Sequence, residues 1–208
     1  MSNAIVYDQP GRTTKAEENA ALIHARIEQL VHALKPASVL EIGSGRGHLG
    51  ARLAVPGIRY CGLEPTASEV EAARAAHPEL QFFQASCYDA PQSIGKFDVV
   101  VSNDVIEHLY DPRALPRVSR QYLAPGGHIV CGTPDYGNYW RNLLLGAAGK
   151  WDAHHTALWH GGHIKFFSRK TLGQLWAAEG FHDFHWGHLR YRLLPFMSWY
   201  LHCTARLR

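Results

Sequence analysis

Three alternating glycines follow an acidic residue in the stretch Glu41-Ile42-Gly43-Ser44-Gly45-Arg46-Gly47. Glycines directly after a buried strand let the backbone turn sharply and approach a ligand closely. A second acidic residue, Glu64, stands 21 positions after Gly43 and precedes Pro65. At the end of the next strand, its carboxylate can accept hydrogen bonds from both hydroxyls of a ribose. The two features together predict binding of a nucleoside-containing cofactor.

Two classes of cofactor fit this turn. The stretch Gly45-Arg46-Gly47-His48-Leu49-Gly50 matches the G-x-G-x-x-G pattern of dinucleotide-binding proteins, which would make the chain a nicotinamide-dependent oxidoreductase. That match begins two residues too late, because Gly43 already ends the strand. Glu41, just before the turn, suits a cationic ligand better than a pyrophosphate. A cationic nucleoside cofactor is therefore favoured.

A second set of polar residues follows the apolar run at 97–102. Asp104, Glu107 and His108 have the i, i+3, i+4 spacing that places three side chains on one face of a helical turn. They can act as an acid and a base, and two carboxylates with an imidazole are also reasonable ligands of a divalent ion. The interpretation that Glu107 and His108 only support the cofactor loop is favoured over a metal site. No metal is therefore predicted.

The stretch 134–166 is rich in aromatic residues and is predicted to be an irregular lid over the substrate. Four of the chain's 14 histidines lie in it, namely His154, His155, His160 and His163. A zinc site at His160 and His163 lacks a recognised third ligand. Three aromatic residues are expected to pack the lid rather than stack on an acceptor: Tyr136, Tyr139 and Trp159.

These groups must be positioned by an alternation of strands and helices. Five short apolar runs are predicted to be strands, at residues 38–42, 59–64, 81–86, 97–102 and 127–133. Helical patterns separate them, as the crossovers between parallel neighbours require. Two further segments, 181–189 and 198–207, are expected to pair as a closing hairpin, although residues 193–200 also fit a membrane-surface segment. The sequence predicts an α/β fold with a doubly wound, mostly parallel, seven-stranded sheet of Rossmann-like type.

Length and composition limit the remaining possibilities. The 208 residues fit a single domain with a loose arm (1–13), a cofactor-binding core (14–133), the lid (134–166), and a last helix with the C-terminal strands (167–208). The formal net charge of +3, without a run of basic residues, does not indicate nucleic acid binding. No apolar run approaches the roughly 18 residues of a membrane-spanning helix, which predicts a cytoplasmic protein without stable membrane insertion. The four cysteines stand far apart and indicate neither disulfides nor zinc.

At several motifs the sequence resembles the class I S-adenosylmethionine-dependent methyltransferases. Their glycine motif, (Asp/Glu)-x-Gly-x-Gly-x-Gly, matches residues 41–47. Further signatures of the family are GLEP at 62–65, FDVVVSNDVIEH at 97–108, DP at 111–112 and LAPGG at 123–127. The stretches PDYGNYWRNLLLG at 134–146 and HIKFFS at 163–168 are similar to the small bacterial methyltransferases related to the ubiquinone and methionine biosynthesis groups.

This resemblance implies S-adenosyl-L-methionine as the cofactor and transfer of its methyl group to a small-molecule acceptor. The acceptor atom is predicted to be a hydroxyl oxygen of a quinone precursor, a sugar or another metabolite. The residues predicted to bind the cofactor are Glu41, Gly43, Gly45, Gly47, Glu64, Pro65, Ser86, Cys87 and Asn103. The residues predicted to act in catalysis are His163, His108 and Glu107, with His163 as the first candidate for the base.

One departure from the family keeps a non-enzymatic alternative open. The family often has an acidic residue after the third strand that contacts the adenine amino group, and here that position is Ser86. A regulatory protein that binds the cofactor without turnover is therefore the alternative. The oligomeric state, monomer or dimer, is left open.

Overall fold

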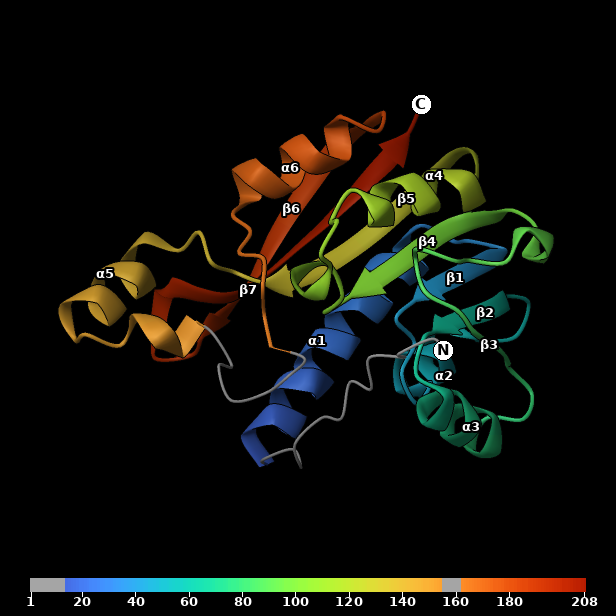
Figure 1. Cartoon of the computed structure of the whole chain (residues 1–208), viewed down its shortest axis with the longest axis horizontal. Coiled ribbons are helices and arrows are strands. Elements are labelled where there is room, and N and C mark those ends of the chain that lie inside the picture. Colours follow the sequence, from blue (N-terminus) through green and yellow to red (C-terminus); the bar gives the residue numbers. More distant parts are fainter. Residues whose placement is uncertain (1–13, 155–161) are drawn as a thin grey trace.

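The computed structural model describes residues 14–154 and 162–208 and joins seven strands in one sheet (Figure 1). The strands are β1 (Ser38–Ile42), β2 (Arg59–Glu64), β3 (Gln81–Gln84), β4 (Phe97–Asn103), β5 (Leu123–Pro134), β6 (Phe181–Tyr191) and β7 (Leu194–Leu207). Their order is β3-β2-β1-β4-β5-β7-β6. β1 to β5 run parallel, and β7 is antiparallel to both β5 and β6. The predicted doubly wound α/β sheet with a closing hairpin is confirmed.

Helices cover both faces of this sheet (Figure 1). They are α1 (Thr14–Ala33), α2 (His48–Leu53), α3 (Ala67–Ala76), α4 (Ala114–Tyr122), α5 (Tyr139–Ala147) and α6 (Arg169–Ala177), with short 3₁₀ helices at Gln92–Ile94, Ile106–His108 and Trp151–His154. One buried apolar cluster contains Ile27 of α1, Leu53 of α2 and Val70 of α3. The other contains Leu115 of α4 and Trp176 of α6. Two apolar layers therefore hold the sheet between them.

The strand order reverses between β1 and β4, and this point positions the site. β1 pairs with β2 on one side and with β4 on the other. In register, Ile42 lies beside Leu63 and Ser102, so the three strands end at the same edge. Crossover connections that leave on opposite faces open a crevice beyond the carboxyl ends of such strands. The glycines after β1, Glu64 and Asn103 all lie at this edge.

The segment 134–166 differs from the irregular lid expected from sequence, because residues Tyr139–Ala147 form α5. The side chain of Asn138 caps this helix by accepting a hydrogen bond from the Arg141 N–H at 2.9 Å. None of the residues of α5 is buried. The helix has only nine residues, about two and a half turns, which is too short for its apolar periodicity to stand out in the sequence.

The closing hairpin is longer than predicted. β6 extends to Tyr191 and β7 begins at Leu194, so residues 193–200, which also fit a membrane-surface segment, belong mostly to the sheet. Among the helices of the described ranges, none is long and apolar enough to cross a membrane. The four cysteines are buried as free thiols.

Candidate cofactor-binding and catalytic site

The three glycines after β1 form a turn at the crevice. Their φ angles are +84° at Gly43, +49° at Gly45 and +79° at Gly47, a region that side chains with a Cβ rarely adopt. A Cβ on Gly43 would overlap with Val105, and a Cβ on Gly47 would lie 2.7 Å from Phe82. At Gly45 a Cβ would meet no other described atom within 4 Å. The backbone at Gly45 is therefore open to the close approach of a ligand.

Glu64 lies beside this turn at the end of β2. Its side chain is buried, and its carboxylate accepts hydrogen bonds from the N–H groups of Gly45 and Thr66, both at 3.0 Å. A carboxylate offers about four lone-pair positions, so others remain for the hydroxyl groups of a ligand. Pro65 follows as an exposed residue whose carbonyl accepts a hydrogen bond from the Gln84 amide at 3.4 Å. The residues present fit a ribose beside the glycine turn.

Glu41 lies in β1, buried against Tyr60 of β2, whose hydroxyl donates a hydrogen bond to its carboxyl group. Burial raises the pKa of Glu41 to about 8, although the hydrogen bond from Tyr60 acts in the opposite direction, and the charge of Glu64 raises this pKa further. A carboxyl group with this pKa is mostly protonated at neutral pH. At neutral pH Glu41 is therefore largely uncharged. The expectation that Glu41 favours a cationic ligand assumed a negatively charged carboxylate at this position.

Ser86 and Cys87 follow β3. Ser86 donates hydrogen bonds from its N–H, at 2.7 Å, and from its hydroxyl to the carboxylate of Asp89. The hydrogen bond from the Ser86 side chain lowers the pKa of Asp89, and burial raises the pKa of Cys87 to about 12. An acidic group thus lies beside Ser86 although position 86 is not acidic itself. Asp89 stands three positions after Ser86, so the two residues are close enough along the chain for this contact to be local.

Asn103 at the end of β4 is held by residues on both sides. Its carbonyl oxygen accepts a hydrogen bond from Tyr200 of β7, and its amide donates one to Asp104 at 3.1 Å. Burial raises the pKa of Tyr200 well above its usual value, which keeps the phenol protonated as a donor. Sequence analysis did not single out Tyr200, because this partner lies 97 positions away.

The structure brings together the three residues predicted to act in catalysis. Glu107, His108 and His163 each offer one oxygen or nitrogen atom, and these atoms lie within 4.8 Å of one another. Glu107 is buried and accepts a hydrogen bond from Thr133 at the end of β5, at 2.9 Å. Burial, followed by the charge of Asp104, raises the pKa of Glu107 well above its usual value. A neutral carboxyl group beside two imidazoles can donate its proton and later take it back.

His163 reaches this cluster from the far end of the segment 134–166. Tyr136 is hydrogen-bonded to its Nδ1, and the rings of His163 and His108 meet edge to face with centroids 4.9 Å apart. The two residues after His163 donate their backbone N–H groups to the carbonyl of Glu107 at 2.9 and 3.0 Å. This stretch of backbone is thus fixed on the short helix that carries Glu107.

The other lid residues singled out from sequence have different positions. Tyr136, expected to pack the lid, packs against Phe166 with ring centroids 4.7 Å apart and also contacts His163. Tyr139 is exposed on α5. Outside the described residues lie His155, His160 and Trp159, and the side chain of His154. The zinc site considered at residues 160 and 163 stays a hypothesis.

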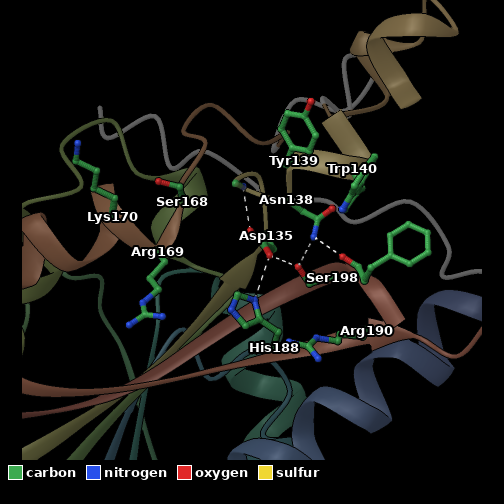
Figure 2. Close-up of a pocket in the computed structure, with 12 residues that line it drawn as sticks. Asp135, Asn138, Tyr139, Trp140, Ser168, Arg169, Lys170, His188, Arg190 and Ser198 are labelled. Carbon is green, nitrogen blue, oxygen red and sulfur yellow. Dashed lines mark hydrogen bonds and ion pairs between the residues drawn. The ribbon is translucent and has the colours of Figure 1, made fainter. Parts of the chain in front are cut away.

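A cavity of about 350 Å³ lies beyond the end of β5, between α5, α6 and the hairpin (Figure 2). At its base the buried carboxylate of Asp135 accepts hydrogen bonds from Ser198 and from the Gly137 N–H at 2.9 Å, and contacts Nδ1 of His188 at 3.2 Å. The Asn138 amide donates to the Ser198 hydroxyl at 3.0 Å. Sequence analysis missed this network, because only the pairing of β5 with the hairpin brings the residues together.

This cavity adjoins the crevice through β7. Ser198 and Tyr200 are two positions apart on the strand, so they lie on the same face and roughly 7 Å from each other. Ser198 contacts Asp135 in the cavity, whereas Tyr200 contacts Asn103 at the crevice. One strand therefore links the base of the cavity to the loop after β4.

The sheet is doubly wound, a glycine turn lies at its switch point, and an acidic residue ends the next strand. These features together define a protein that binds a nucleoside-containing cofactor. The model of the methyltransferase-domain family matches residues 15–185, so the chain belongs to this family. The class I S-adenosylmethionine-dependent methyltransferase recognised from the sequence motifs is confirmed. The nicotinamide alternative finds no support in this family.

Similar sequences agree with this assignment. An uncharacterized methyltransferase from Mycobacterium sp. (strain JLS) is 33% identical over 117 residues, which are 55% of this chain and 46% of that protein. A ubiquinone biosynthesis O-methyltransferase from Cronobacter sakazakii (strain ATCC BAA-894) is 33% identical over 100 residues, which are 46% of this chain and 41% of that protein. The chain spans about half the length of the curated relatives it matches.

Solved structures share the fold over nearly the whole chain. Magnesium protoporphyrin IX methyltransferase from Synechocystis PCC 6803 has a TM-score of 0.72 at 15% identity, covering 97% of this chain and 91% of that one. The N-methyltransferase NodS from Bradyrhizobium japonicum WM9 has a TM-score of 0.65 at 17% identity, covering 95% of this chain and 89% of that one. At these identities the likeness establishes the fold.

Proposed function

We propose that this protein transfers the methyl group of S-adenosyl-L-methionine to a hydroxyl oxygen of a small-molecule acceptor. This proposal rests on the proximity of three side chains near the loop after β4, those of Glu107, His108 and His163. The cofactor supplies a methyl group on a positively charged sulfur. A hydroxyl acceptor has to lose its proton during the displacement, and the cluster offers groups that accept one. The relative named for O-methyl transfer supports oxygen as the acceptor atom.

Residues at the switch point would bind the cofactor. Glu64 keeps lone pairs for ribose hydroxyls, and the Gly45 backbone is open for close approach. The Asp89 carboxylate, oriented by Ser86, is a suitable acceptor for the adenine amino group. Asn103, fixed by Tyr200, is assigned to face the cofactor from the end of β4. The two relatives of known fold that were solved with S-adenosylhomocysteine support this cofactor.

His163 is assigned as the base. Burial raises the pKa of Tyr136, so its phenol stays neutral. When Nδ1 of His163 carries the hydrogen and donates it to the Tyr136 oxygen, Nε2 is the unprotonated nitrogen of the ring and is the atom that can accept the acceptor proton. The positive charge then formed on the imidazole lies beside Tyr136, where the charge of Asp104 also acts, and this carboxylate favours it electrostatically.

The cavity beyond β5 is assigned to the part of the acceptor that lies away from its reacting hydroxyl, because the residues that line this cavity do not include His163. Its volume of about 350 Å³ is at the lower end of the usual range for small-ligand sites. Aromatic side chains of Tyr139, Trp140 and Phe196 line it together with the polar network around Asp135. These walls suit a metabolite with an apolar face and hydroxyl groups, such as a quinone precursor or a sugar.

Calorimetric titration with S-adenosyl-L-methionine and S-adenosylhomocysteine tests the cofactor assignment. We expect binding to the wild-type protein and its loss in Glu64→Ala, because the ribose would lose its carboxylate partner. Glu69→Ala is the matched control, since that carboxylate lies on α3 in an exposed ion pair with Arg46 at 3.1 Å. A folded wild-type protein that binds neither compound would overturn the proposal.

Once cofactor binding is established, turnover tests the chemistry. Phenols, sugars and hydroxy acids are incubated with labelled cofactor, and the methylated product is identified by mass spectrometry. Methyl transfer to oxygen is the expected result. Transfer to nitrogen or carbon would refute the acceptor assignment, and cofactor binding without turnover of any acceptor would favour the regulatory alternative.

A further inference from the structure

Large apolar side chains are exposed together at one end of the molecule. Of the fourteen exposed large hydrophobic side chains among the described residues, eight belong to the segments 139–151 and 193–196, so their exposure is concentrated rather than scattered. We call these eight the end surface: Tyr139, Trp140, Leu143, Leu144, Trp151, Leu193, Leu194 and Phe196.

The two segments form one continuous surface. The rings of Trp140 and Phe196 meet edge to face with centroids 5.9 Å apart, and the Asn138 amide donates a hydrogen bond to the Phe196 carbonyl at 3.2 Å. Figure 1 shows α5 and the bend between β6 and β7 projecting together, at the end of the molecule opposite α2 and α3. Leu193, at the bend, is 89% exposed.

α5 does not bury an apolar face against the sheet. None of its residues is buried, whereas α4 and α6 bury apolar side chains against the sheet. A helix of nine residues draws most of its stability from packing of an apolar face rather than from its own propensity. Apart from the contact of Trp140 with Phe196, the apolar side of α5 is therefore left exposed within the described residues.

The charges around the end surface indicate what covers it. Lys150, Arg190 and Arg192 are exposed beside it, and within the described ranges none of the three forms an ion pair with a carboxylate. Asp152 is the one acidic residue in the segments 139–152 and 190–196. Trp and Tyr favour the boundary between water and lipid, and exposed cations favour an anionic headgroup layer.

We infer that the end surface binds peripherally to an anionic membrane, with its apolar side chains in the headgroup boundary and the three cations on lipid phosphates. A second copy of this chain fits less well, because a symmetric contact would place both copies' sets of these unpaired cations in one interface. Binding at this surface does not depend on the methyl transfer proposed above. It would place the cavity lined by Tyr139, Trp140 and Phe196 next to the lipid layer.

Vesicle sedimentation with the full chain tests this inference. The probes are phosphatidylcholine vesicles with and without about 30% phosphatidylglycerol. We expect the wild-type protein to sediment with the anionic vesicles, and to bind about tenfold less to the neutral ones or at about 0.5 M salt. Leu144→Glu combined with Leu193→Glu is expected to lower binding about tenfold or more, because both side chains are exposed on the apolar part of the surface.

Leu22→Glu is the matched control, since Leu22 is 58% exposed on α1 and outside the end surface. It should bind as the wild type does. Circular dichroism and the unfolding midpoint establish that each variant is folded, and the salt dependence of the wild type requires no variant. The inference is wrong if the wild type ignores anionic vesicles, or if the control loses as much binding as the double variant. A double variant that changes only the oligomeric state in light scattering would assign the surface to a second copy.

Discussion

Tyr136 and His163 are hydrogen-bonded to each other, although they stand 27 positions apart at the two ends of one long connection. The ring of His163 is also 4.9 Å from that of His108, in the short helix after β4. This contact closes the connection between β5 and α6 onto the helix that carries Glu107. The geometry of the predicted base therefore depends on Tyr136, which sequence analysis assigned only to packing.

Removing the imidazole of His163 should slow turnover without weakening cofactor binding. We expect His163→Ala to lower kcat by about 10²- to 10⁴-fold, the range typical of general acid–base catalysis. Its cofactor Kd should stay near that of the wild type, because the glycine turn and Glu64 are untouched. His185→Ala, on the exposed side of β6, is the control. Near-normal turnover of His163→Ala would remove the base assignment.

Tyr136→Phe tests whether the phenol positions His163. The variant keeps the ring packed on Phe166 and loses the hydrogen bond to Nδ1. We expect kcat to fall about tenfold, and the double variant with His163→Ala to be no slower than His163→Ala alone, since groups that act as a unit are not additive. Fully additive losses would show that the two residues act independently.

Chelation should leave activity unchanged. The atoms of Glu107, His108 and His163 are close enough to hold a cation, but burial raises the pKa of Glu107 well above its usual value, so a metal would have to displace a proton there. Assays after treatment with ethylenediaminetetraacetate measure this directly. Lost activity that returns with magnesium or manganese would replace the acid–base interpretation with a metal site.

Glu41 should make the protein less stable as the pH rises. Its folded-state pKa of about 8 lies above the ordinary value of a glutamate, 4.5. Its contribution to the free energy of unfolding is therefore fully present below about pH 4.5 and is lost as the pH rises through about 8. The upper limit of this loss is about 1.4 kcal/mol for each unit by which the pKa is raised. Glu41→Gln keeps an acceptor for Tyr60 and should lose less stability between pH 5 and pH 9. Denaturant titrations across this range measure the difference, and parallel curves for the two proteins would contradict it.

Gly43→Ala should cost more than backbone strain alone. Gly43 and Gly57 have similar φ angles, +84° and +92°, but only at Gly43 would the new Cβ overlap with a neighbour, the Val105 side chain. We expect Gly57→Ala to cost about 1 kcal/mol and Gly43→Ala about 2 to 4 kcal/mol, with weaker cofactor binding for Gly43→Ala only. Equal losses of stability in both variants would show that Val105 moves aside without cost.

The sequence by itself determined the parts of the fold that local patterns encode. Short apolar runs separated by helical patterns gave the five parallel strands, because buried parallel strands are apolar along their length. The glycines at 43–47 and Glu64 were found because a backbone turn needs glycine at fixed positions. Glu107 and His108 were found together because they are neighbours in one short helix.

Only the tertiary structure decided how these parts meet. The contacts of Tyr200 with Asn103, of Thr133 with Glu107 and of Ser198 with Asp135 join residues 97, 26 and 63 positions apart. No spacing along the chain encodes such contacts, because the register between strands fixes which side chains become neighbours. The same register buries Glu41, and this burial raises its pKa. The residue type alone does not indicate that shift. The site therefore combines residues that the sequence identifies one by one with an arrangement that only the packed sheet creates.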